Sequence, residues 1–273
     1  MKHISYHKII KSLKRELLKA NVNLNHEVLE ILKKYSSNEI VKFLVDNAEI
    51  SLKSKLPLCQ DTGIIEFFVE LGNEVRLEKD ITSILNKAVA QAYKEYYFRY
   101  SVVSDPLFER KNTFSNIPCI VNLDHIPGDK LKIEFLVKGG GSENLTALKM
   151  FEPSASIDEI KEFIIEHIKL NGGKACPPLH IGIGIGGTAE KAVFLSKKAL
   201  LKSFKMRNSN ALYKNLEEEL LKKLNELKIG FQGLGIGPTV LSVNIEYFPT
   251  HIATLPVAVS VNCYLCRKGV IEL

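Results

Sequence analysis

The sequence contains no tryptophan, no secretory signal segment and no apolar run of the roughly 18 residues that a membrane-spanning helix needs. We therefore expect no membrane association, and a soluble protein in a reducing cytoplasm. The net charge of +6 on 273 residues arises from lysines spread along amphipathic segments. Because no dense basic run is interleaved with aromatic residues, we expect no nucleic-acid partner. A positive balance suits a small acidic substrate equally well.

The sequence also lacks the two Cys-x-x-Cys motifs that a zinc ribbon uses, and its cysteine count is five. An odd count does not suit a disulfide framework, and the lack of paired modules argues against a zinc ribbon. The chain has no proline-, glycine- or serine-rich linker, no low-complexity stretch and no internal repeat. We therefore expect one domain covering residues 1–273.

Hydrophobic periodicity predicts a helical N-terminal region followed by a mixed sheet with flanking helices, an α/β (mixed α+β) fold. We expect Asn25, Ser37 and Asp80 to be helix N-caps, and residues 127–129 to be a turn that joins a pair of strands. The expected helices are 7–20, 26–35, 38–49, 80–97, a short one ending before Pro153, 157–171, 188–203 and 210–228. The expected strands are 64–71, 117–123, 130–138, 179–186, 239–247 and 256–263.

Three cysteines, Cys59, Cys176 and Cys263, stand among turn formers and polar residues, where a buried structural cysteine would have apolar neighbours. Three thiolates brought together can hold a [4Fe–4S] cluster by three of its irons and leave the fourth iron open to a substrate. Cys119 lies in an apolar strand, so we expect a core thiol. Cys266 follows Cys263 in a Cys-x-x-Cys pair without the strand–motif–helix context of a thioredoxin, and we rank it below Cys263 as a ligand.

Polar groups accompany these cysteines. Gln60 and Asp61 follow Cys59 directly, and a carboxylate so near a thiolate indicates a site more than an incidental turn. His180 lies four residues after Cys176, and a buried structural histidine and a catalytic one are equally good interpretations. Arg99 and Arg110 flank Asp105, where a surface ion-pair set is the simpler interpretation and carboxylate binding the alternative.

Two glycine-rich segments also admit two interpretations. Residues 138–142, Lys-Gly-Gly-Gly-Ser, are either a flexible loop or a cradle whose backbone N–H groups bind an anion. Residues 182–187 match the pattern Gly-x-Gly-x-x-Gly, but a dinucleotide site would need an acidic residue about 20 positions later, and lysines and an arginine stand there. Close backbone packing near a cofactor is the better interpretation.

With these residues together, the chain resembles the α subunit of two-subunit class I fumarases and L-tartrate dehydratases, which are iron–sulfur hydro-lyases. The resemblance runs along nearly the whole chain. The matching segments are 58–63 (Leu-Cys-Gln-Asp-Thr-Gly), 104–110 (Ser-Asp-Pro with Arg110), 138–144 (Lys-Gly-Gly-Gly-Ser-Glu-Asn), 175–188 (Ala-Cys-Pro-Pro-Leu-His through Thr188) and 255–263 (Leu-Pro-Val through Asn-Cys).

The resemblance implies roles for particular residues. Cys59, Cys176 and Cys263 would be the three cluster ligands. Gln60, Asp61, Arg99, Gly140, Gly141 and Ser142 would contact the substrate, and Gln60, Asp61 and His180 are the candidate catalytic residues. The resemblance also implies a separate β subunit that closes over the site, and pairing of the α subunit with itself as α2β2.

We therefore expect a hydro-lyase that adds water reversibly to a dicarboxylate, with fumarate and malate as the substrate pair and tartrate dehydration as the alternative. An iron–sulfur sensor without turnover is a second hypothesis, against which Gln60 and Asp61 argue. A nucleotide-binding enzyme that uses residues 182–187 is a third, and the missing acidic residue disfavours it.

Overall fold

The computed structural model describes residues 1–273 and divides the chain into two compact units. The first unit comprises residues 1–139 and 267–273, and the second comprises residues 140–266. Each unit has its own sheet and its own apolar core. The predicted α/β class, with mixed sheets and flanking helices, is confirmed, and the single domain over residues 1–273 stays a prediction.

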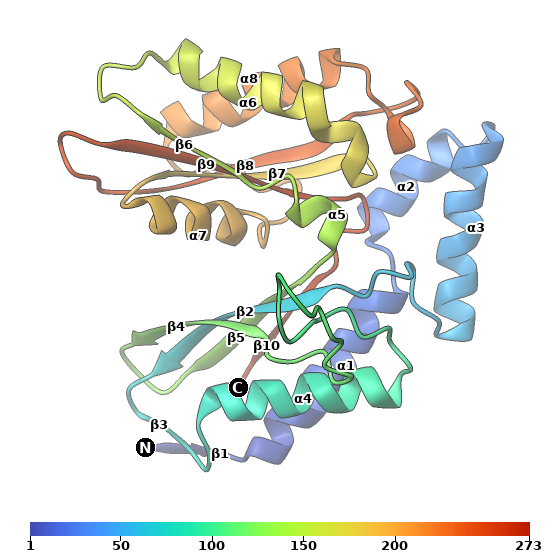
Figure 1. The fold of residues 1–273 in the computed structure, drawn as a ribbon, viewed down its shortest axis with the longest axis vertical. Coiled ribbons are helices and arrows are strands. Elements are labelled where there is room, and N and C mark those ends of the chain that lie inside the picture. The colour runs from blue at the N-terminus through green and yellow to red at the C-terminus, as the bar shows by residue number, and fades with distance from the viewer. The chain divides into compact units, whose positions relative to one another are not determined.

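The first unit combines four helices with a four-stranded mixed sheet of order β10-β5-β2-β4 and a small parallel pair, β1-β3 (Figure 1). Its helices are α1 (Tyr6–Val22), α2 (His26–Lys34), α3 (Glu39–Ser54) and α4 (Ile81–Glu95). Its strands are β1 (Lys2–Ile4), β2 (Ile64–Gly72), β3 (Val75–Leu77), β4 (Ile120–Ile126), β5 (Leu131–Lys138) and β10 (Lys268–Glu272).

The core of the first unit lies where α1 and α4 pack on one face of this sheet. Ile65, Phe67 and Val69 alternate along β2, so all three point to the same face. Their side chains meet the apolar stripe of α1, which includes Leu13 and Leu17. The 3.6-residue period of the helix and the two-residue period of the strand thus specify one interface.

The second unit is a three-layer arrangement with a sheet of order β6-β9-β7-β8. Helices α6 and α8 lie on one face of the sheet and α7 on the other (Figure 1). Its helices are α5 (Gly140–Glu143), α6 (Ile157–Asn171), α7 (Ala189–Ala199) and α8 (Ala211–Glu226), with short 3₁₀ helices η1 (Gly172–Ala175) and η2 (Phe231–Gly233). Its strands are β6 (Ala147–Phe151), β7 (Leu179–Gly186), β8 (Val240–Phe248) and β9 (Leu255–Asn262).

The glycines of β7 allow α7 to approach the sheet closely. A Cβ atom on Gly182 would lie 2.0 Å from the Ser196 carbonyl oxygen, and one on Gly184 would lie 2.0 Å from the Ala192 carbonyl oxygen. The isoleucines that alternate with these glycines face the apolar core on the other side, which contains residues of α6 and α8. Close packing of a helix on a strand therefore explains the Gly-x-Gly-x-x-Gly match without a nucleotide.

Most predicted elements form, and the differences have physical reasons. Asn25 and Asp80 cap helices as predicted. Asn38 caps α3 in place of Ser37, because its side-chain oxygen accepts the N–H groups of Ile40 and Val41.

The strands after residue 117 differ more. β4 and β5 do not pair with each other: the apolar strand β2 lies between them, parallel to β4 and antiparallel to β5. Residues 147–151, expected to be helical, form the edge strand β6, because pairing with β9 outweighs local propensity. β1, β3 and β10 were not predicted.

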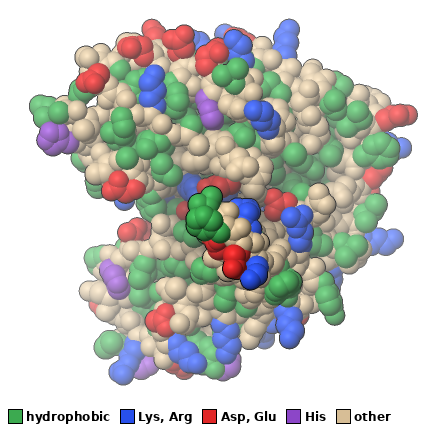
Figure 2. All heavy atoms as spheres, in the orientation of Figure 1, with side chains coloured by type: hydrophobic (Ala, Val, Ile, Leu, Met, Phe, Trp, Pro, Cys, Tyr) green, Lys and Arg blue, Asp and Glu red, His purple; other side chains and the backbone are tan.

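Basic and acidic side chains are interspersed on the face shown in Figure 2. Lys161 on α6 and Glu219 on α8 form an ion pair at 2.8 Å. None of the helices combines the length and the apolar character that crossing a lipid bilayer requires.

Candidate functional site

In the first unit, the segment from Cys59 to Gly63 joins helix α3 to strand β2. Neighbouring elements hold both of its ends. The Leu58 N–H donates to the carbonyl oxygen of Asn21 at 2.8 Å, and the Asn47 side chain donates to the Leu58 carbonyl oxygen at 2.9 Å. The start of the segment is therefore attached to the end of α1 and to α3.

The other end of this segment is tied to buried polar groups. The buried Tyr93 hydroxyl donates to the carbonyl oxygens of Thr62 and Gly63. The Asn116 side chain donates to the Gly63 carbonyl oxygen at 3.1 Å. Gly63 has φ +73°, and a Cβ atom there would lie 2.7 Å from the Lys138 carbonyl oxygen, so only glycine fits. The turn is thus rigidly specified.

Backbone N–H groups of the turn donate to both the Cys59 sulfur and the Asp61 carboxylate. The Asp61 N–H donates to the Cys59 Sγ at 3.4 Å, and the Gly63 N–H donates to Asp61 Oδ1 at 2.9 Å. Cys59 and Asp61 are half-buried, and Gln60 is exposed. An N–H group that points at a thiolate sulfur is one of the devices that stabilise and tune a bound iron–sulfur cluster.

The structure brings Arg99 to this segment, although 36 residues separate it from Gly63. The Thr62 hydroxyl donates to the Arg99 carbonyl oxygen at 2.6 Å, and the Arg99 side chain is exposed. Within the first unit, therefore, Cys59, Gln60, Asp61 and Arg99 lie around one turn. Spacing along the sequence does not reveal this proximity.

Asp105 and Arg110 have a different role from the surface ion pair that we expected. The Asp105 carboxylate accepts the N–H groups of Leu107, Phe108 and Glu109 at 3.0, 2.9 and 3.0 Å, and these bonds hold its pKa below the ordinary value. Arg110 donates to the Pro106 carbonyl oxygen. These hydrogen bonds fold the loop, and no ion pair joins the two side chains.

In the second unit, the segments that carry Cys176 and Cys263 are direct neighbours. The N–H of Tyr264 donates to the Cys176 carbonyl oxygen at 3.3 Å. Cys176 is exposed, has φ +50° and follows η1, and half-buried Cys263 follows the end of β9. Because β7 and β9 are antiparallel, the structure places two of the three predicted ligands at the same end of these two strands.

Cys266 is buried, and its thiol donates to the Cys263 carbonyl oxygen at 3.1 Å. This contact turns its sulfur toward the backbone of the Cys263 turn, and its rank below Cys263 as a ligand stays a prediction. Cys119 is also buried: its thiol contacts Asn86 Oδ1 at 3.1 Å, and burial raises its pKa to about 11. Both observations fit thiols with structural roles.

The glycine-rich loop lies beside the Cys176 segment. Residues 140–143 form the single turn α5, in which Ser142 is buried, and a Cβ atom on Gly141 would lie 3.6 Å from the Lys174 carbonyl oxygen. An ion pair at 2.8 Å joins Glu143 to Lys197 on α7. Gly140, Gly141 and Ser142 are therefore held near Cys176 within the second unit.

His180 is fully buried on β7. Its Nε2 lies 2.9 Å from Asn244 Oδ1, and its ring contacts Phe204 edge-on at 5.3 Å. These contacts are those of a core histidine that joins strands β7 and β8, and its catalytic role stays a prediction.

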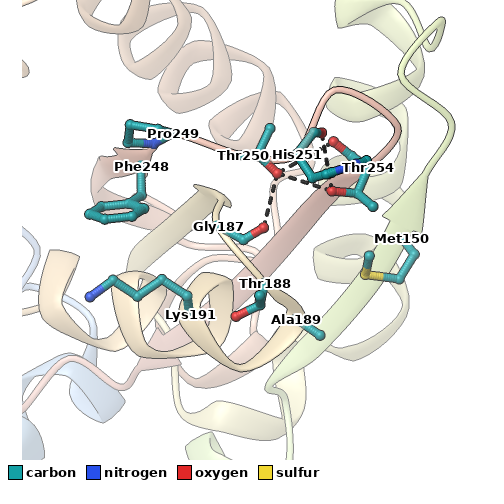
Figure 3. A pocket seen from close by; sticks show the side chains of 10 residues that line it. All are labelled: Met150, Gly187, Thr188, Ala189, Lys191, Phe248, Pro249, Thr250, His251 and Thr254. Atoms are coloured by element: carbon teal, nitrogen blue, oxygen red, sulfur yellow. Dashed lines mark hydrogen bonds between the residues drawn. The ribbon is translucent and has the colours of Figure 1, made fainter.

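A cavity in the second unit lies away from the cysteines. It has a volume of about 640 Å³ and is lined by Met150, Gly187, Thr188, Ala189, Lys191, Phe248, Pro249, Thr250, His251 and Thr254 (Figure 3). It opens where β7 ends and β9 begins, whereas Cys176 precedes β7 and Cys263 follows β9. Eight-residue strands separate the two ends by roughly 26 Å. This cavity therefore lies at the opposite end of the sheet from the predicted cysteine ligands of the second unit.

Sequence reasoning missed Arg267, which stands just before β10. Its side chain is 4% exposed, and its Nη1 donates to Asn21 Oδ1 at 3.0 Å. No motif marks this arginine, so only the tertiary structure shows that it lies beside the Cys59–Gly63 segment.

Comparison with known proteins places this mixed α/β chain among the hydro-lyases. The model of the family described as fumarate hydratase (Fumerase) matches residues 7–272. The chain therefore belongs to the class I fumarate hydratase family and resembles its α-type chains.

Several relatives are named as subunits. The putative L(+)-tartrate dehydratase subunit alpha of Methanocaldococcus jannaschii is 39% identical over 251 residues, which is 89% of this chain and 88% of that protein. The L(+)-tartrate dehydratase subunit alpha of an Escherichia coli strain is 36% identical over 233 residues, or 84% and 77% of the two chains. Its counterpart in Shigella sonnei is 37% identical over 229 residues, or 83% and 75%.

Enzymes of this family are iron–sulfur enzymes in general. Each of the two units carries cysteines that are candidate ligands of such a group. One sulfur, that of Cys59, accepts a backbone N–H, and the segments of Cys176 and Cys263 are hydrogen-bonded neighbours. Cysteine sulfurs are the usual ligands of an iron–sulfur cluster.

Proposed function

We propose that the chain is the α subunit of an iron–sulfur hydro-lyase that hydrates fumarate reversibly to (S)-malate. Cys59, Cys176 and Cys263 hold the [4Fe–4S] cluster in this proposal, and a separate β subunit completes the enzyme. The single observation that carries the proposal is that the Cys59 turn contains Gln60 and Asp61 and is hydrogen-bonded to the backbone of Arg99, because a carrier or sensor has no need of an amide, a carboxylate and an arginine beside the thiol.

When bound, such a cluster offers an open iron that acts as a Lewis acid on the hydroxyl that leaves. The Gly63 N–H donates to Asp61 Oδ1 and so holds one of the two carboxylate oxygens. Asp61 is then placed to hold the proton of the hydroxyl group, and the exposed Gln60 amide can hydrogen-bond a substrate oxygen.

Loss of a proton from carbon leaves negative charge on the substrate carboxylate. The exposed Arg99 guanidinium has a fork of N–H donors that suits bidentate binding of a carboxylate, and its fixed positive charge stabilises the charge that develops. The N–H groups of residues 140–142 at the start of α5 provide a second set of donors for an anion. No residue of this chain is assigned as the base that removes the proton from carbon.

Dehydration of L-tartrate to oxaloacetate is the second candidate, and the names of the relatives favour it. Tartrate differs from malate by one hydroxyl group, and discrimination of that group depends on a few hydrogen bonds in the pocket. Self-association as α2β2 and a cytoplasmic location complete the proposal.

The test is anaerobic co-purification with the β subunit, iron and sulfide analysis, and fumarate absorbance after addition of L-malate. We expect about four irons per α chain and formation of fumarate. A full cluster without fumarate formation, together with oxaloacetate formation from L-tartrate, would assign the second candidate. A protein without iron under strict anaerobiosis would refute the three-cysteine site.

Cysteine variants test the ligands one at a time. Cys59→Ser, Cys176→Ser and Cys263→Ser should each lose cluster and activity, because one thiolate in three is removed. Cys119→Ser and Cys266→Ser are matched controls, since both thiols make structural contacts. A Cys176→Ser protein with a full cluster and full activity would remove that residue from the ligand set.

A further inference from the structure

Arg267 is a buried cation beside the Cys59–Gly63 segment. Its guanidinium forms no direct ion pair, and its one side-chain hydrogen bond goes to the neutral amide of Asn21. Burying a charge is costly unless charge or hydrogen bonds nearby compensate it. A nearby negative charge would offset this cost.

Asp61 and Arg267 meet at Gly139. A Cβ atom at Gly139 would lie 3.1 Å from Asp61 Oδ2 and 3.6 Å from Arg267 Nη2, so both groups border the same small space. The environment of Tyr93 shows the same proximity: burial is the largest influence and raises its pKa, the Arg267 charge lowers it, and the Asp61 charge raises it. Glycine at position 139 therefore leaves room for two opposite charges beside one backbone position.

Arg267 also reaches the other end of the segment through Asn21. Arg267 Nη1 donates to Asn21 Oδ1 at 3.0 Å, and the Asn21 carbonyl oxygen accepts the Leu58 N–H at 2.8 Å. The Asn21 amide in turn donates to Leu17 in α1 at 2.9 Å. One side chain thus connects the residue before Cys59 with the carboxylate two residues after it.

We propose that Arg267 is a positioning residue of the dehydration site: it orients the Asp61 carboxylate by charge attraction across Gly139 and holds the start of the Cys59 segment through Asn21. It does not contact the substrate. This inference rests on the proposed function, since it assigns Asp61 a part in the reaction.

The kinetic test compares Arg267→Gln and Arg267→Lys with Arg207→Gln in the complete, cluster-loaded enzyme with its β subunit. Arg207 is a matched control, because it donates only to backbone carbonyl oxygens of Phe204 and Met206. We expect Arg267→Gln to lower kcat by roughly 30-fold with KM changed less than about threefold, because misplacement of a catalytic group affects the transition state most. Arg267→Lys should recover part of kcat, and the iron content should stay unchanged.

A second readout does not depend on the cluster. In the cluster-free full chain, the effect of Asp61→Asn on the unfolding equilibrium constant should differ by about fivefold between the wild-type and the Arg267→Gln backgrounds, since the effects of interacting residues are not additive. An unchanged kcat, a rise in KM alone, or additive effects on unfolding would each overturn the inference. If the wild-type enzyme turns over neither malate nor tartrate, the proposed function fails, and the coupling measurement still decides whether Arg267 acts on Asp61.

Discussion

Replacing Gly184 with alanine should destabilise the second unit strongly. The added Cβ atom would lie 2.0 Å from the Ala192 carbonyl oxygen and 2.6 Å from the Ser196 nitrogen, both in the backbone of α7. Because a helix backbone cannot rotate away as a side chain can, α7 itself must move. The shift needed to reach ordinary contact is roughly 1.4 Å, and overpacking of this kind costs about 3 kcal/mol or more.

The consequences reach beyond one contact. A shift of α7 would strain the hydrogen bond between Ser196 and Ser260, which is 2.8 Å long, and the ion pair between Lys197 and Glu143. A loss of about 3 kcal/mol is a large fraction of the roughly 5–15 kcal/mol that stabilises a typical domain. We therefore expect Gly184→Ala to be partly unfolded at moderate temperature.

Urea unfolding followed by far-ultraviolet circular dichroism measures this effect. Gly173→Ala is a matched control, because its Cβ atom would lie 3.9 Å from the nearest side chain, and we expect a change within about 0.5 kcal/mol. If the two units unfold in separate transitions, the loss belongs to the transition of residues 140–266. Equal stability of Gly184→Ala and wild type would refute the packing explanation of the glycines.

Three further outcomes are expected. Tyr93→Phe removes the hydroxyl that donates to two carbonyl oxygens of the cysteine turn, so the free energy of unfolding should fall by about 1–2 kcal/mol, and an unchanged urea midpoint would contradict this. Burial raises the pKa of Glu217 above its ordinary value of 4.5, so its contribution to the free energy of unfolding is fully present below pH 4.5 and is lost as the pH rises through the folded pKa. Glu217→Gln should therefore flatten the pH dependence of the free energy of unfolding. Parallel curves of stability against pH for wild type and variant would contradict this. In the cluster-free chain at pH 8, a pKa of about 11 leaves roughly one Cys119 thiol in a thousand ionised. Iodoacetamide should therefore label the exposed Cys176 and not the buried Cys119, and peptide mass spectrometry measures the labelling of each.

Local chemistry made several features of the fold predictable. The helix periods, the Asn25 and Asp80 caps and the alternation along β2 each depend on neighbours a few residues away, so a single sequence reveals them. Strand pairing depends on residues far apart in the chain. The insertion of β2 between β4 and β5, and the pairing of β6 with β9, therefore became clear only in three dimensions.

Some features of the candidate site also follow from the sequence, and others depend on the tertiary structure. The sequence alone determined the chemical inventory, which is three cysteines among turn formers and polar residues, with an amide and a carboxylate beside Cys59, because residue types and their neighbours are read directly from the chain. That these cysteines hold a cluster stays a prediction. Only the tertiary structure decided which residues surround each turn, since Arg99 and Arg267 approach the Cys59 segment through long-range contacts. It also decided that the glycines of β7 serve a helix and not a nucleotide, because a Cβ clash depends on the distance between α7 and the sheet, which no local pattern encodes.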